Sequence, residues 1–243
     1  RATPLRTLRI ENSCTMSPIA ASLQALHGEI ESTCARHERA PGSVALLAVS
    51  KRQPLAALRE AYACGQREFG ENYVQEALEK RQQLRDLDIS WHFIGPIQTN
   101  KTRDIASGFD WVHSVDRPRV AERLSAQRDP ALPPLNVCVQ VKLSAEETKS
   151  GVALADVEAL CALVDALPRL CLRGLMAIPA PLATFPEQRA CFAPLRAEFL
   201  RLQSAFPSLD TLSIGMSGDF EAAIAEGSTV VRIGTALFGA RPD

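Results

Sequence analysis

Long apolar runs are missing from this sequence of 243 residues, and so is an excess of charge of either sign. No stretch approaches the roughly 20 apolar residues that span a bilayer. The 27 basic and 28 acidic residues give a net charge of −1, and no basic run is present. The composition therefore argues against a membrane-spanning protein, and against nucleic acid or an anionic membrane as the main partner.

Closely spaced cysteines are missing as well. The seven cysteines are scattered and none forms a CxxC motif, which excludes the usual zinc-ribbon and thioredoxin patterns. No cluster of His, Cys and carboxylate residues stands out, so we expect no metal site. Reduced thiols are typical of a cytoplasmic protein, and that is the location we expect.

The first fifteen residues carry arginines but lack the apolar block of a signal peptide. They precede Met16 and match nothing in the pattern that follows. We therefore expect residues 1–15 to be an extension that is disordered or not native, with a transit peptide as a minor alternative. Residues 16–243 then form one domain, because α/β barrels of this length are commonly single domains.

What is present is a regular alternation of strand-like and helix-like segments. A first amphipathic helix, with apolar residues from Ile19 to Cys34 at spacings of three to four, should end at Pro41-Gly42. Eight short apolar runs follow, at 44–51, 67–72, 90–95, 110–115, 136–143, 172–178, 211–217 and 230–234. They are apolar on both faces, as parallel strands buried on each side are. The pattern predicts a single (β/α)8 TIM barrel with an extra N-terminal helix, and a doubly wound open sheet is the alternative.

In a barrel, the carboxyl ends of the strands form the working face. Here two glycine-bearing turns follow the last two strands: Gly215-Met216-Ser217-Gly218 and Gly234-Thr235. We expect each turn to open a helix, with Ser217 as a cap, and to offer backbone N–H groups to an anion such as a phosphate. The plainer interpretation is that the glycines only serve tight turns and the serine only caps a helix.

Arg232 lies on the last predicted strand, on the same face as the glycine of the turn that follows. An arginine on a core strand needs a partner. We expect either an ion pair with Glu71 or Asp219, or a contact with a ligand at the barrel mouth. His92 and His113 also lie in predicted strands, and for both a hydrogen-bonded core role is favoured over a ligand role.

Lys51 closes the first predicted strand, LLAVSK, although lysine is costly to bury. A partly desolvated lysine near other cations has a lowered pKa and is nucleophilic as the free amine. With a phosphate site across the mouth, it suggests a Schiff base with a phosphorylated aldehyde. Pyridoxal 5′-phosphate (PLP) fits both features, with its aldehyde on Lys51, its phosphate at the two turns and its ring between them. A sugar-phosphate aldolase combines the same features, and a lysine that only reaches from the rim into solvent is the plainer alternative.

Several motifs in this order resemble those of one known family. They are LLAVSK, FGENYVQEALEK, WHFIGPIQTNK, the ETKSG of 147–151, RGLMAIPAP and IGMSGDFEAAIAEGSTVVRIGTALFG, from about Ile19 to the C-terminus. The sequence is similar to the pyridoxal phosphate homeostasis proteins, whose fold resembles the N-terminal barrel of alanine racemase. So many motifs in one order are far more specific than any of them alone.

The resemblance implies that PLP is the cofactor and that six residues bind it: Lys51, Asn72, Ser217, Arg232, Gly234 and Thr235. Within this set, Lys51 would form the Schiff base and Arg232 would face the pyridine nitrogen. The two turns would hold the phosphate, and Asn72 would lie near the face of the ring.

The resemblance also implies a binding role in intracellular PLP (vitamin B6) and amino-acid homeostasis rather than an enzyme. An arginine does not readily protonate the pyridine nitrogen, which disfavours carbanion chemistry. Racemisation needs acid–base groups on both faces of the substrate carbon, and Tyr62 and Tyr73 are the only phenols. A PLP-dependent, racemase-like enzyme is the alternative. We expect a monomer whose partners are the cofactor and, transiently, apoenzymes that use it.

Overall fold

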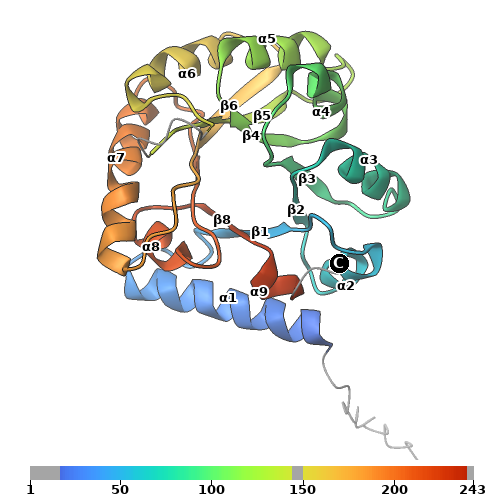
Figure 1. The fold of residues 1–243 in the computed structure, drawn as a ribbon, viewed down its shortest axis with the longest axis vertical. Helices are drawn as coiled ribbons and strands as arrows, with labels where there is room; N and C mark the ends of the chain where they lie inside the picture. The colour runs from blue at the N-terminus through green and yellow to red at the C-terminus, as the bar shows by residue number, and fades with distance from the viewer. Residues whose placement is uncertain (1–16, 144–149, 240–243) are drawn as a thin grey trace, which may run out of the picture.

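The computed structural model describes residues 17–143 and 150–239. Its eight strands are β1 (Ala45–Val49), β2 (Glu68–Glu71), β3 (Ser90–Phe93), β4 (Trp111–Val115), β5 (Leu135–Gln140), β6 (Leu170–Met176), β7 (Thr211–Ser213) and β8 (Val230–Ile233). All neighbours are parallel, and β8 pairs with β1, so the sheet closes on itself (Figure 1). The predicted TIM barrel is therefore confirmed, and the open sheet is excluded.

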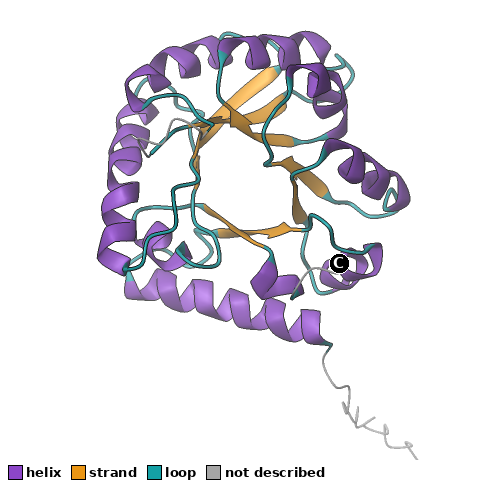
Figure 2. Ribbon diagram, viewed as in Figure 1, coloured by secondary structure: helices purple, strands orange, loops and turns teal. Residues whose placement is uncertain are grey.

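Helices surround the ring of strands (Figure 2). They are α1 (Pro18–Arg36), α2 (Leu55–Ala63), α3 (Val74–Gln83), α4 (Thr102–Gly108), α5 (Pro118–Gln127), α6 (Val157–Asp165), α7 (Phe185–Gln203), α8 (Phe220–Ala225) and α9 (Thr235–Phe238), with 3-10 turns at Thr99–Lys101 and Leu154–Asp156. The extra helix α1 precedes the barrel and contacts α2, α8 and α9. No helix in the described ranges is long and apolar enough to cross a membrane.

Helix α1 begins and ends at identifiable signals. Ser17 accepts a hydrogen bond from the Ala20 N–H, and Pro18 occupies the first turn, where its missing N–H costs nothing. The helix stops five residues before the predicted Pro41-Gly42 because Glu38 adopts φ +55°. The N–H of Arg39 then bonds to the carbonyl of Cys34, the pattern of a Schellman motif.

The barrel interior is close-packed, as the strand burial shows. The central residues of β1, β3 and β4 are buried, and a Cβ at Gly174 on β6 would lie 1.6 Å from the carbonyl oxygen of Thr211 on β7. Only glycine lets these two strands approach so closely.

The strand β7 is shorter than predicted, since it ends at Ser213 and the chain then leaves the ladder. The predicted extension 1–15 and residues 147–149 of ETKSG lie outside the described residues.

Candidate functional site

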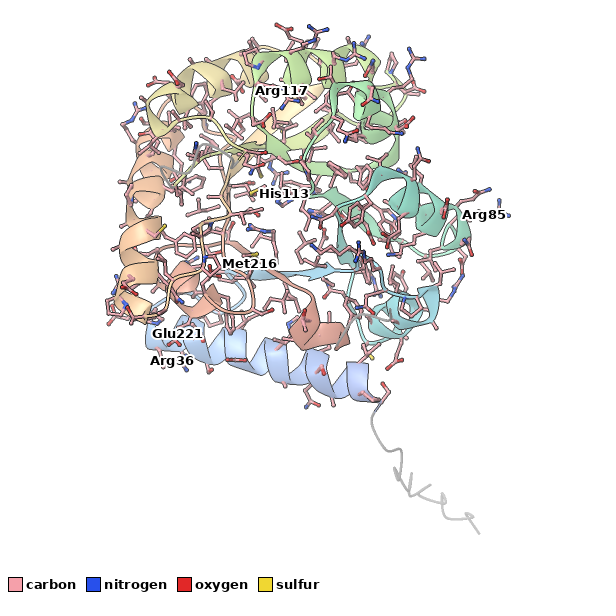
Figure 3. The ribbon with its side chains drawn as sticks, in the orientation of Figure 1. Arg36, Arg85, His113, Arg117, Met216 and Glu221 are labelled. Carbon is pink, nitrogen blue, oxygen red and sulfur yellow. The ribbon has the colours of Figure 1, made fainter. Side chains whose placement is uncertain are left out.

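A pocket of about 280 Å³ opens at the carboxyl ends of the strands. It is lined by Val49, Lys51, Gln53, Asn72, Ile94, Ile178, Met216, Ser217, Arg232, Gly234 and Thr235. All six residues that the sequence singled out are in this set. Figure 3 shows Met216 on the turn after β7, on the side of the ring where α8 packs. The volume is near the lower end of the range for small-molecule sites.

Lys51 stands on a turn that the backbone holds firmly. The preceding Ser50 is buried, and its N–H bonds to the carbonyl of Gly70 on the adjacent strand at 3.0 Å. The following Arg52 has φ +59°, a left-handed conformation that is uncommon outside glycine. Its N–H donates to the Glu76 carboxylate at 2.5 Å. Lys51 itself is half-buried, at the wall of the pocket.

A buried ion pair lies behind this turn. The ammonium of Lys80 donates to Ser50 O at 2.6 Å, to Glu71 Oε1 at 2.9 Å and to Glu76 Oε1 at 2.6 Å. Ser50 Oγ also donates to Glu71 Oε1, at 2.6 Å. Burial raises the pKa of the Glu71 carboxyl, and the charge of Lys80 offsets only part of that rise. These contacts fix the segment that carries Lys51.

Asn72 follows β2 and lines the same pocket. Its Oδ1 is buried without a hydrogen-bond partner in the structure. A buried unpaired amide oxygen is costly, so a ligand donor in the pocket would satisfy it. Gly95 makes this position possible, because a Cβ there would lie 2.2 Å from the Asn72 carbonyl oxygen.

Arg232 is buried on β8, with its guanidinium at the pocket wall. Nη1 donates to both oxygens of Ser213, at 2.5 Å to the carbonyl and 2.9 Å to Oγ, and Nη2 donates to the Ala177 carbonyl at 2.9 Å. Burial lowers the pKa of Arg232 to about 10, so it stays charged at neutral pH. Glu71 is bonded to Lys80 instead, and Asp219 acts on Arg232 only as a nearby negative charge. The expected direct ion pair with either carboxylate is therefore absent from the described contacts.

The turn after β7 differs from the sequence expectation in one respect. Asp219, not Ser217, precedes α8, and its Oδ1 accepts the Met216 N–H at 2.6 Å. Ser217 is therefore no helix cap, and its exposed hydroxyl lines the pocket. The helices α8 and α9 have only six and four residues, so they offer a few N–H groups rather than a long dipole. On the turn after the neighbouring strand β8, Gly234 lies where a Cβ would be 3.0 Å from the Val49 carbonyl oxygen.

Sequence reasoning missed five residues that line the pocket: Val49, Gln53, Ile94, Ile178 and Met216. Ile178 is unusually exposed for its type, at 39%, and Met216 is half-buried. An aliphatic side chain and a flexible thioether suit the faces of a planar ring. The only available signal was their position just after a strand end, which polar residues share.

Neither tyrosine reaches this pocket. Tyr62 lies on α2, where its hydroxyl accepts from the Asp88 N–H, and Tyr73 is 48% exposed at the start of α3. His92 and His113 are buried and hydrogen-bonded to each other, which confirms the core role expected for them. Within the part of the chain that the structure describes, no group of three or more His, Cys, Asp or Glu side chains could hold a metal ion.

Comparisons with known proteins place this architecture in a family. The family model "Alanine racemase, N-terminal domain" matches residues 22–242. A pyridoxal phosphate homeostasis protein of Pseudomonas aeruginosa is 58% identical over 226 residues, which are 93% of this chain and 97% of that protein. A protein of the same description from Escherichia coli is 50% identical, over 93% of this chain and 98% of the other.

A solved structure is similar over most of the chain as well. PipY of Synechococcus elongatus with PLP bound has a TM-score of 0.79 and 44% sequence identity, over 91% of this chain and all of that one. The class is thus that of barrels like the N-terminal domain of alanine racemase. Within that class, this chain belongs to the family of the pyridoxal phosphate homeostasis proteins.

Proposed function

We propose that this protein binds PLP as a Schiff base on Lys51 and holds it for intracellular vitamin B6 and amino-acid homeostasis. The observation that carries the proposal is the convergence on one pocket of a lysine amine, a buried arginine and two polar turns. The relatives named for PLP homeostasis, and the PLP-bound structure of PipY, support the choice of ligand.

The residues of the pocket fit this cofactor. The Lys51 amine adds to the aldehyde carbon, and the aldehyde oxygen leaves as water, so no oxidant or reductant is needed. Ser217 and Thr235 offer hydroxyl groups to the phosphate. Gly234, which has no side chain, lets the backbone come close to it. Arg232 presents a donor to the pyridine nitrogen, and the unpaired Asn72 Oδ1 accepts from a donor on the ligand.

A holding role suits these residues better than catalysis. The guanidinium of Arg232, although its pKa is lowered to about 10, gives up a proton far less readily than a carboxylic acid or an imidazolium does. A bound PLP ring would therefore stay a weak electron sink. Neither tyrosine borders the pocket as a second base. The cytoplasmic location, the monomeric state and transient transfer to apoenzymes stay predictions.

Reconstitution of the purified protein with PLP tests the proposal. The wild type should acquire the absorption band of a lysine Schiff base, and Lys51→Ala should not. Lys142→Ala is the matched control, because Lys142 is also half-buried and follows a barrel strand but does not line the pocket. A normal band in Lys51→Ala would overturn the assignment of that residue.

The racemase-like alternative is favoured by the shared fold alone. It predicts exchange of the Cα proton of amino acids with solvent. Deuterium incorporation at Cα, measured for the wild type and for Lys51→Ala, separates the two functions. Rapid incorporation of deuterium that depends on Lys51 would support an enzyme. The absence of incorporation would support a holding protein.

A further inference from the structure

The barrel interior contains a continuous row of polar side chains where such barrels usually pack branched apolar ones. Five side chains on five strands form this row, here termed the interior chain: Glu68 on β2, His92 on β3, His113 on β4, Ser213 on β7 and Arg232 on β8. Figure 3 shows His113 inside the ring of strands. Burying so many polar groups is costly unless each is paired, which calls for a reason.

The contacts of the interior chain are short and unbroken. Arg232 Nη1 donates to Ser213 Oγ at 2.9 Å, and Ser213 Oγ lies 2.8 Å from His113 Nδ1. His113 Nε2 lies 2.9 Å from His92 Nδ1, and His92 Nε2 contacts the Glu68 carboxylate. Both histidines and Ser213 are buried. The interior chain therefore links the pocket to the amino-end mouth of the barrel, where the Glu68 side chain is 41% exposed.

The two ends fix the direction of every bond. Arg232 is only a donor, and an ionised Glu68 is only an acceptor. Burial raises the pKa of Glu68, but hydrogen bonds from His92 and Ser90 outweigh it and leave the pKa below its usual value. Burial lowers the pKa of His113 well below its usual value, and the nearby charge of Arg232 adds to this effect, so the His113 ring is neutral.

When His92 carries its single ring proton on Nε2, facing Glu68, one arrangement satisfies all members. Ser213 accepts from Arg232 and donates its single hydroxyl proton to His113 Nδ1. His113 donates through Nε2–H to His92 Nδ1, and His92 donates through Nε2–H to Glu68. Every donor in the interior chain points away from the pocket. The interior chain therefore runs from the positive charge of Arg232 at one end to the negative charge of Glu68 at the other. Trp111 stacks on His92 at 5.3 Å and 5°, which holds that ring in plane.

We propose that the interior chain positions the Arg232 guanidinium for the ring nitrogen of the cofactor. Glu68, at the opposite mouth of the barrel, is then a positioning residue that acts through four intervening contacts. This inference rests on the function proposed above. It assigns a purpose to buried groups that neither the Schiff base nor the phosphate site uses.

The first test needs no cofactor. The chain has four histidines, so ¹⁵N-histidine labelling with His92→Gln and His113→Gln as assignment variants resolves the two resonances of interest by NMR. We expect His113 of the unliganded wild type to carry its single ring proton at Nε2, the nitrogen that faces His92 Nδ1. Protonation of His113 at Nδ1 would overturn the arrangement, whatever the protein binds.

The second test measures PLP affinity by titration. Ser213→Ala, which removes the hydroxyl from both neighbours, should weaken PLP binding about tenfold or more. Glu68→Gln keeps an acceptor oxygen but removes the charge, and should weaken it about threefold to tenfold. Asp210→Asn removes a carboxylate near the same mouth outside the interior chain, and should change affinity by less than about twofold.

A double-mutant cycle distinguishes positioning from a general structural role. If Glu68 acts through Arg232, then Glu68→Gln should have no further effect on PLP affinity in an Arg232→Met background. An undiminished effect there, or wild-type affinity in Ser213→Ala, would overturn the proposal. If the wild type binds no PLP at all, the proposed function fails and takes the positioning role with it, whereas the NMR result still decides the arrangement.

Discussion

The ammonium of Lys80 donates a 2.6 Å hydrogen bond to the carbonyl oxygen of Ser50, the residue that precedes Lys51. The same ammonium pairs with Glu71, whose side chain is fully buried. A charge placed inside the protein thus holds the main chain at the base of the candidate Schiff-base lysine. Stability and the geometry of the pocket therefore depend on the same contact.

Lys80→Met should lower the free energy of unfolding by about 3–5 kcal/mol, because it leaves Glu71 buried without its partner. Urea unfolding followed by circular dichroism measures this loss. Arg81→Met, the next residue on the same helix, whose hydrogen bond to the Ser107 carbonyl is exposed, should change it by less than about 1 kcal/mol. Adding Glu71→Leu to Lys80→Met should recover part of the loss. Equal stability of Lys80→Met and Arg81→Met would contradict the buried pair.

Gly95→Ala should weaken PLP binding more than it weakens the fold. The new Cβ would lie 2.2 Å from the Asn72 carbonyl, so the backbone of a pocket residue must move. Titration with PLP should show a loss of about tenfold or more, as expected for a displaced polar contact.

Gly28→Ala is the control for this substitution. Gly28 lies within α1, and a Cβ at this position would have no neighbouring atom within 4 Å. Alanine should therefore raise stability by about 1 kcal/mol and leave PLP affinity unchanged. Unaltered PLP affinity in Gly95→Ala would mean that Asn72 contributes nothing to the site.

His113 should make the fold sensitive to acid. Its folded-state pKa lies well below its usual value, because the buried ring resists charge. The unfolded chain takes up this proton near pH 6.5, so the stabilising contribution is complete above that pH and falls as pH drops toward the folded pKa. Each pH unit below the unfolded-state pKa costs about 1 kcal/mol from this one group, until the folded-state pKa is reached.

Urea unfolding at about pH 7.5 and pH 5.5, for the wild type and for His113→Gln, isolates this contribution. The wild type should lose more stability than the variant between the two pH values. If the variant does not fold, the NMR signal of His113 in the wild type replaces it and should titrate well below the usual pKa of histidine. An equal loss in both proteins, or a His113 signal that titrates near its usual pKa, would contradict the assignment.

The barrel could be predicted from the sequence because its signal is repeated eight times. Each short run that is apolar on both faces indicates a strand buried on both sides. An error in the boundary of one strand does not change the number of strands predicted. The pocket could be predicted for the same reason, since strand ends in a barrel share one mouth. The end of α1 was misplaced because Glu38 takes the left-handed conformation that glycine usually marks.

What the sequence did not reveal are partnerships between distant side chains. Glu71 and Asp219 were equally plausible partners for Arg232, yet Glu71 pairs with Lys80 one helix away. The interior chain, from Glu68 to Arg232, joins residues up to 164 positions apart in the sequence. No local sequence pattern predicts contacts over such a separation. Ile178 and Met216 were missed because an apolar residue after a strand carries no chemical signal.

The central claim is a covalent bond between PLP and Lys51, and the most direct measurement is reduction with borohydride followed by peptide mapping. Protein reconstituted with PLP should lose its Schiff-base absorption band on reduction, and the pyridoxyl group should be found on the peptide that contains Lys51. The same treatment of Lys51→Ala should leave that peptide unlabelled. A label on another lysine, or no trapped lysine after reconstitution of the wild type, would contradict the claim and make a barrel that binds a different phosphorylated ligand the better account.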